Sequence, residues 1–374
     1  MSFFTNFLKS WINFFKIKNL KKNKKQIIFY VENSADWVFL EPVAKKLKQK
    51  SINLIKITSD AKDEYLNNLD VYFIGSGTAR TILFRTINSK GFVMTLTDLD
   101  TFHLKKSIYP IHYFYLFHSM VSTHRVYREH AFNAYDTIFC SGKYQIAEIL
   151  ETENKYNIKN KILIKQGYVR LDGLIKRKFK YNNNNHQKNI IIAPTWGKSS
   201  LISIHLENLI KILIVENYFV TLRLHPMTLR HYPKLHKEIE NKFKKTGKFM
   251  YDSNLKNEIS ITNNDIMISD WSGAALEFAF ANERPVIFID TKPKINNPNW
   301  KKINKSCFEE YIRRDIGVVV SENHLTEVPN IINSLLKNRK KWSKKISKIR
   351  NENIFNIGKS SQIAANTIIK TLKL

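Results

Sequence analysis

The sequence predicts an α/β protein of two domains, each built on a mostly parallel sheet with helices on both faces. Short apolar runs alternate with stretches of helical periodicity along most of the chain, which is typical of parallel sheets. An asparagine-rich stretch at residues 180–188 interrupts the alternation, which then starts again. With 374 residues, the chain is long enough for two domains of ordinary size.

These patterns divide the chain into four parts: a basic amphipathic segment at 1–25, a first Rossmann-like domain at 26–180, a second at 189–345 and a helical tail at 346–374. Parallel sheets bind ligands at the carboxyl ends of their strands. We therefore expect the ligand in the cleft between the two domains.

In the first domain, apolar runs rich in β-branched and aromatic residues predict strands. They cover 27–31, 52–58, 71–74, 92–96, 111–117, 137–140 and 162–165. Helical spacing of apolar residues predicts helices at 37–50, at 78–88 and from Lys143 onward. Gly75 and Gly77 lack the third glycine of a dinucleotide fingerprint, so they are weak evidence for such a cofactor.

In the second domain the same reasoning gives strands and then a series of helices. The strands cover 189–193, 219–224, 265–269, 286–289 and 318–320. The helices cover 204–216, 274–281, 325–337, 338–350 and 360–372.

The turn Asp270-Trp271-Ser272-Gly273 joins a predicted strand to a predicted helix. The first turn of a helix has unpaired N–H groups and partial positive charge, which together bind phosphate. Ser272 offers a hydroxyl, and Gly273 lets the backbone approach an anion closely. The alternative is an ordinary connection in which Ser272 caps the helix.

Two histidines also follow predicted strands. His225 precedes Pro226, and its imidazole could bind a phosphate oxygen or donate a proton, with Arg223 as a second donor. His118 is flanked by hydroxyl residues, which suits a general base. For each histidine an alternative remains, a surface loop residue at 225 and a core residue at 118.

The composition is strongly basic. Lys and Arg number 61 against 32 acidic residues, a formal net charge of +29. Such a charge attracts nucleic acid, anionic lipid or phosphate-bearing substrates and does not choose among them. Cys140 and Cys307 are far apart in the sequence, which predicts neither a disulfide nor a zinc site and fits a reducing cytoplasm.

Residues 1–25 combine aromatic residues at helical spacing with a lysine-rich end. This pattern predicts an amphipathic helix on an anionic membrane surface, and the alternative is a helix docked on its own protein. No apolar run is long enough to span a bilayer.

Four motifs together resemble the CDP-glycerol glycerophosphotransferase family. They are APTW at 193–196, RLHP at 223–226, DIMISDWSGAALEFAFANERPVIF at 265–288 and, more loosely, GYVRLD at 167–172. The chain departs from the family pattern at three places. Gly273 replaces a second serine, Val169 replaces a proline, and Phe117-His118-Ser119-Met120 replaces Trp-His-Gly-Thr.

The resemblance implies a GT-B-like fold with the CDP-alcohol bound mainly by the second domain. It implies that His118 takes the proton of an acceptor hydroxyl and that His225, supported by Arg223, neutralises the diphosphate as CMP leaves. The further substrate-binding residues that it implies are Ser272 and Gly273 for phosphate, Glu277 for the ribose hydroxyls, and Thr195, Arg170 and Asp270.

The implied substrates are CDP-glycerol or a related CDP-polyol and a lipid-linked or polymeric acceptor at the cytoplasmic face of the membrane, with no metal and no cofactor.

A nucleotide-sugar glycosyltransferase or epimerase with the same fold is the alternative enzyme. Asp98-Leu99-Asp100 has the carboxylate spacing of a metal-dependent glycosyltransferase, which is a minor alternative. A nucleic-acid binder is a third possibility, but no aromatic-basic motif supports it, and we expect no nucleic-acid partner.

Overall fold

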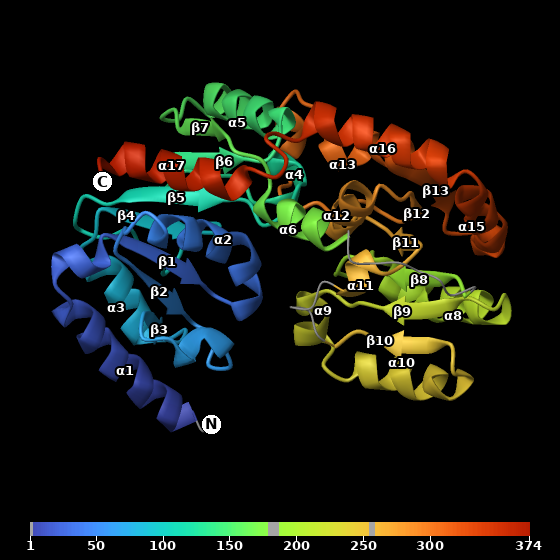
Figure 1. Ribbon diagram of the computed structural model, residues 1–374, viewed down its shortest axis with the longest axis horizontal. Coiled ribbons are helices and arrows are strands. Elements are labelled where there is room, and N and C mark those ends of the chain that lie inside the picture. Colours follow the sequence, from blue (N-terminus) through green and yellow to red (C-terminus); the bar gives the residue numbers. More distant parts are fainter. Residues whose placement is uncertain (1–2, 179–186, 254–258) are drawn as a thin grey trace.

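The structure is a computed structural model that describes residues 3–178, 187–253 and 259–374. Two parallel sheets, each with its own helices, lie side by side (Figure 1), and we call these units the first and second lobes. The predicted class, two Rossmann-type domains, is confirmed. Most of the predicted linker at 180–188 lies outside the described residues.

The first lobe contains a seven-stranded parallel sheet in the order β3-β2-β1-β4-β5-β6-β7. Alternate residues of its strands enter two different core layers, as Ile28 and Phe29 of β1 illustrate. Because both faces are covered, the strands are apolar throughout, which explains why the sequence revealed them. The strands are β1 (Ile27–Val31), β2 (Leu54–Thr58), β3 (Val71–Phe73), β4 (Gly91–Met94), β5 (His112–Leu116), β6 (Thr137–Cys140) and β7 (Ile162–Lys165). The helices are α2 (Trp37–Lys48), α3 (Thr78–Thr86), α4 (Thr123–Val126), α5 (Lys143–Tyr156) and α6 (Val169–Lys178).

The second lobe contains a six-stranded parallel sheet in the order β10-β9-β8-β11-β12-β13. The sequence did not reveal its edge strand β10 or the helix α10 before it. The strands are β8 (Asn189–Ile192), β9 (Phe219–Leu222), β10 (Phe249–Tyr251), β11 (Ile266–Ser269), β12 (Val286–Asp290) and β13 (Gly317–Ser321). The helices are α7 (Leu201–Ile204), α8 (Leu206–Val215), α9 (Pro226–His231), α10 (Leu235–Phe243), α11 (Ile259–Thr262), α12 (Gly273–Asn282), α13 (Phe308–Tyr311), α14 (Arg313–Ile316) and α15 (Val328–Lys337).

The C-terminal chain connects the two lobes. Helix α16 (Arg339–Asn353) lies along the second lobe, and α17 (Ser360–Leu372) returns to the first lobe beside α2 (Figure 1). Ala364, Ala365 and Ile368 are fully buried there, in the core layer that contains Phe29. The chain between these helices also covers part of one sheet edge, since a Cβ at Gly167 would lie 2.4 Å from the Phe355 carbonyl oxygen.

The N-terminal helix α1 (Phe3–Asn19) packs against α3 and β3 by one face. Asn13 Nδ2 donates to the Phe73 carbonyl at 2.9 Å, and the Lys25 ammonium donates to the Ile17 carbonyl at 2.8 Å at the end of the helix. Large apolar side chains of the opposite face are exposed, namely Phe4, Phe7, Leu8, Ile12 and Phe15. Among the described residues, no helix combines the length and apolarity needed to cross a bilayer.

Candidate active site

The loops that follow β5, β8, β9, β11 and β12 meet where the two lobes face each other. The two imidazoles predicted from the sequence lie close enough that a positive charge on His118 lowers the pKa of His225. The tip of the β5 loop reaches the second lobe, where Ser119 Oγ would lie 2.3 Å from a Cβ at Gly273. The structure thus brings His118, His225 and the start of α12 close together at partly exposed positions between the lobes, and we call this region the crevice.

His225 is held at the start of α9. Its Nδ1 accepts the backbone N–H of Met227 at 3.1 Å, so the ring is the N-cap of that helix. Burial, together with the nearby positive charge of Lys294, lowers the pKa of His225 to about 3, so the ring is neutral at pH 7. Since Nδ1 is the acceptor, the single ring proton lies on Nε2, where it can be donated to a phosphate oxygen.

His118 follows β5 and is packed among aromatic rings. Its ring centre lies 6.3 Å from that of Phe39 and 5.7 Å from that of Tyr127. Burial lowers the pKa of His118 to about 4, while a hydrogen bond to the Thr95 backbone favours the protonated form. Nδ1 of His118 also lies 3.4 Å from the Tyr115 hydroxyl, a long contact whose donor depends on the tautomer. A neutral imidazole keeps one unprotonated nitrogen that can accept a proton, as a general base requires.

The turn after β11 leads into helix α12, and the structure shows its simpler, capping role. Ser272 Oγ accepts the N–H of Ala274 at 3.3 Å, which makes it the N-cap of α12. Both Ser272 and Gly273 are half-buried at the crevice. The hydroxyl hydrogen of Ser272 and the amides of the first turn remain suited to an anion.

Lys294, in the loop after β12, is a site residue that the sequence did not indicate. Its ammonium lies 4.0 Å from the centre of the Trp196 ring, and that ring lies 6.2 Å from His225. The charge of Lys294 lowers the pKa of both His118 and His225, so the ammonium lies near both rings. Within the described part of the chain, the ammonium makes no ion pair or hydrogen bond.

Burial lowers the pKa of Lys294 to about 8, and the carboxylate of Asp270 opposes this effect. Asp270 itself is fully buried and accepts the N–H groups of Thr195 at 2.7 Å and of Leu201 at 3.0 Å. The Asp270 carboxylate therefore fixes the loop that carries Thr195 and Trp196.

Arg223 is buried, and its guanidinium is directed toward Asp252 and Ser260 at the ends of β10 and α11. Burial lowers its pKa, and the Asp252 carboxylate opposes this. The structure thus pairs Arg223 with an acidic residue that sequence reasoning did not include.

Glu277 and Arg170 lie together between the lobes. Glu277 Oε1 accepts the Tyr168 hydroxyl at 2.7 Å, and Oε2 lies 3.4 Å from the Arg170 guanidinium. Glu277 belongs to α12 and Arg170 to α6, so their contact joins the two predicted motifs across the junction seen in Figure 1.

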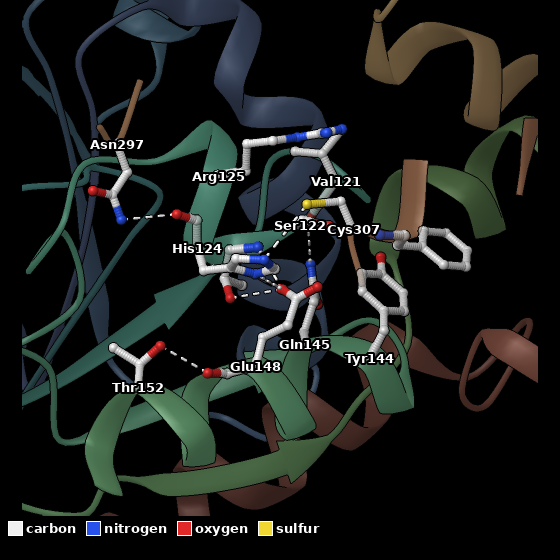
Figure 2. Close-up of polar contacts among 12 residues, drawn as sticks. Val121, Ser122, His124, Arg125, Tyr144, Gln145, Glu148, Thr152, Asn297 and Cys307 are labelled. Carbon is white, nitrogen blue, oxygen red and sulfur yellow. Dashed lines mark hydrogen bonds and ion pairs between the residues drawn. The ribbon is translucent and has the colours of Figure 1, made fainter. Parts of the chain in front are cut away.

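A second polar contact holds the His118 loop against the second lobe. Arg125 is buried, and its guanidinium bonds Glu309 at 2.9 Å and Glu310 at 2.8 Å. Figure 2 shows the adjoining cluster, in which Asn297 Nδ2 donates to the His124 carbonyl at 2.9 Å. The loop after β12 is thus anchored to the first lobe on the C-terminal side of Lys294.

Within the same cluster, His124 Nε2 lies 3.5 Å from Cys307 Sγ and Nδ1 lies 3.6 Å from Glu148 (Figure 2). All three side chains are buried. Burial raises the pKa of Cys307 to about 12, so the thiol is protonated at pH 7. We interpret this cluster as part of the joint between the lobes.

A sequence model of the family described as CDP-Glycerol:Poly(glycerophosphate) glycerophosphotransferase matches residues 12–293, which include both histidines and the turn at 270–273. The chain belongs to this family. It is therefore a transferase of the glycerophosphotransferase type. No curated protein gives a significant match to the chain by sequence.

Solved structures with the same fold include proteins of more than one activity. The glycerophosphotransferase chain matches the wall teichoic acid polymerase TagF with a TM-score of 0.59 and 17% identity, over 100% of this chain and 99% of that one. It also matches MnaA of S. aureus, in a structure with UDP, with a TM-score of 0.63 and 15% identity over 94% and 97% of the chains. UDP-GlcNAc 2-epimerase from Neisseria meningitidis gives a TM-score of 0.55 and 14% identity over 92% and 99%. At this identity these matches show the fold alone.

Two groups of sequence-predicted residues in this glycerophosphotransferase lie outside the crevice. Ser141 and Gly167 come just after the predicted strands 137–140 and 162–165. Ser141 is fully buried and Gly167 is covered by the chain at 353–360, so neither lines the cleft. In the loop that could have held a metal, Asp98 faces Arg128 and Asp100 accepts the N–H of Lys106. The described residues include no group of three His, Cys, Asp or Glu side chains placed to hold a metal.

Proposed function

We propose that the protein transfers glycerol phosphate, or another polyol phosphate such as ribitol phosphate, from a CDP-alcohol to a hydroxyl of a lipid-linked or polymeric acceptor and releases CMP. The observation that carries this proposal is the convergence of two neutral imidazoles and one ammonium beside the start of α12. Phosphoryl transfer depends mainly on positioning and on charge stabilisation, and this crevice supplies both.

In the proposed reaction the acceptor oxygen attacks the β-phosphorus of the donor. The bond from that phosphorus to the bridging oxygen breaks, and CMP leaves with the bonding electrons. The proton of the acceptor hydroxyl passes to His118. A bound diphosphate raises the pKa of this imidazole, because its negative charge favours the protonated form. His118 thereby becomes a better base once the donor is in place.

Three groups balance the negative charge on the other side of the phosphorus. His225 donates from Nε2, because its Nδ1 is committed to Met227. Lys294 supplies a full positive charge that no described carboxylate pairs with directly. Ser272, Gly273 and the first amides of α12 bind the phosphate oxygens. The leaving CMP dianion is thus stabilised as it forms.

The remaining predicted residues would position the nucleotide. We propose that Glu277 binds the ribose hydroxyls while Arg170 holds its carboxylate in place, as their contact suggests. Thr195 lies on the loop that Asp270 fixes, and Arg223 stiffens the loop before His225 through Asp252.

The deciding experiment is a screen for nucleotide release by the purified protein. CDP-glycerol, CDP-ribitol and UDP-sugars are offered as donors with a short glycerol phosphate oligomer as acceptor, and free CMP and UDP are quantified. We expect acceptor-dependent CMP release and transfer of the polyol phosphate to the acceptor. Release of UDP from a UDP-sugar without CMP release would overturn the proposal in favour of a glycosyltransferase or epimerase, which the shared fold also permits.

We further propose that the protein works at the cytoplasmic face of the membrane, bound through α1. The exposed face of α1 carries Phe4 at 67%, Ile12 at 54% and Phe15 at 57% exposure, and the exposed Lys16, Lys21, Lys22 and Lys24 follow it. Aromatic residues beside lysines bind anionic interfaces, and the packed face of α1 keeps this surface in a fixed position on the first lobe.

Vesicle flotation tests this placement. We expect binding to vesicles with anionic lipid, weakened by salt, and loss of binding in Phe7→Ser/Ile12→Ser/Phe15→Ser. Val215→Ser is the matched control, because Val215 is 82% exposed on α8 of the second lobe. Equal flotation of all variants would contradict a role of α1.

A further inference from the structure

Two departures from the family pattern lie against each other in the structure. Ser119 stands where the pattern has a glycine after the histidine, and Gly273 stands where it has a second serine. A Cβ at Gly273 would lie 2.3 Å from Ser119 Oγ and 3.6 Å from Ser119 Cβ. The Ser119 hydroxyl therefore fills the space that a side chain at 273 would take, although it comes from the opposite lobe.

A Cβ at position 273 would displace the Ser119 hydroxyl from the place it takes here, and backbone conformation sets no such limit. Gly273 begins α12, and its φ angle is not positive, so other residues could adopt its conformation. Glycine is one of the weaker helix formers. With glycine at 273, the Ser119 hydroxyl can lie against the start of this helix.

The Ser119 hydroxyl is also available for a ligand. Ser119 is half-buried, and within the described chain its hydroxyl has no hydrogen-bond partner. It directly follows His118 and lies against the first turn of α12. A hydroxyl in a crevice needs a partner, and here the nearest ligand position is the one in front of the α12 amides.

We propose that Ser119 is a phosphate-binding residue that donates a hydrogen bond to the β-phosphate of the donor, in place of a hydroxyl at position 273. This inference rests on the proposed function, since it needs a CDP-alcohol at the start of α12. One short segment then carries both the base, His118, and a phosphate ligand, so the two keep a fixed spacing however the lobes move.

The test is a set of reciprocal variants assayed for kcat/KM with the CDP-alcohol and for CDP affinity by calorimetry. Ser119→Ala should lower both by roughly tenfold to a hundredfold, the effect of losing a hydrogen bond to a charged group. Gly273→Ser alone should stay within about threefold of the wild type, because the new side chain displaces the rotatable Ser119 hydroxyl but supplies a hydroxyl of its own. Ser119→Ala/Gly273→Ser should return to within about threefold of the wild type, since the hydroxyl is restored from the second lobe.

The control variant is Ser119→Ala/Gly273→Ala, which fits the same space without a hydroxyl. We expect it to stay as low as Ser119→Ala. If it recovers as well as Ser119→Ala/Gly273→Ser, or if neither recovers, the inference is overturned, and melting temperatures show whether each variant is folded. Absence of CMP release from every CDP-alcohol by the wild type would refute the proposed function alone, provided that CDP affinity still follows the predicted order. A wild type that does not bind CDP would overturn the inference too.

Discussion

The most direct test of the site is the replacement of His225 by asparagine. The imidazole has one role in the structure and a second in the proposed reaction. Nδ1 caps α9 by accepting the Met227 N–H at 3.1 Å, which leaves the ring proton on Nε2 for donation to the substrate. Asparagine is among the best N-cap residues. His225→Asn therefore keeps the cap and removes the donor.

The size of each effect follows from these roles. Loss of one donor to the developing charge should lower kcat by about 10²–10³-fold, or about 2.7–4 kcal/mol. Loss of the cap, as in His225→Ala, should cost about 1 kcal/mol of stability. For a chain of 374 residues unfolding as one unit, that is a fall in Tm of about 1 °C.

The assay is initial-rate CMP release with saturating donor, combined with thermal unfolding of each variant. His324→Asn is the matched control, because His324 is 61% exposed in the turn after β13. His225→Asn and His225→Ala should be similarly slow, while only His225→Ala should melt earlier than the wild type. Turnover of His225→Asn within threefold of the wild type would refute the role of the imidazole as a donor.

Two further predictions concern pH and the contact between the lobes. Burial lowers the pKa of His118 to about 4, which places the acid limb of kcat/KM well below pH 6.5. Activity should therefore be lost only as the pH falls toward about 4. Lys294 has a pKa of about 8, which burial lowers and Asp270 raises, and its neighbours are His118 and His225. Loss of its proton should give an alkaline limb of activity near pH 8, and this limb should move upward in Lys294→Arg. An alkaline limb that does not move would remove Lys294 from the site. Arg125→Met leaves the buried Glu309 with the Ser122 N–H but without its charged partner, which should cost about 3–5 kcal/mol and lower Tm by about 4–6 °C. Arg128→Met, three residues away and 62% exposed, is the control and should change Tm by less than about 1 °C, and equal melting of the two variants would contradict the importance of this contact.

The sequence by itself determined the succession of elements. Strands such as β1 are buried on both faces, so burial is encoded in a continuous apolar run that needs no knowledge of neighbours. The motifs around His225 and Ser272 were equally visible, because a strand end, a turn and a helix start are local features. For the same reason the sequence could predict which loops face the cleft, although Ser141 and Gly167, at the ends of two other predicted strands, lie outside it.

Only the tertiary structure decided which side chains meet. Lys294 has no local signal of function among so many lysines, and it became a site residue because the β12 loop is pinned beside Trp196. Arg170 and Glu277 were predicted separately and turned out to contact each other. Ser119 and Gly273 are far apart in the sequence, but in the fold the Ser119 hydroxyl lies against Gly273. Such pairings depend on how two lobes dock, and periodicity along the chain carries no information about that.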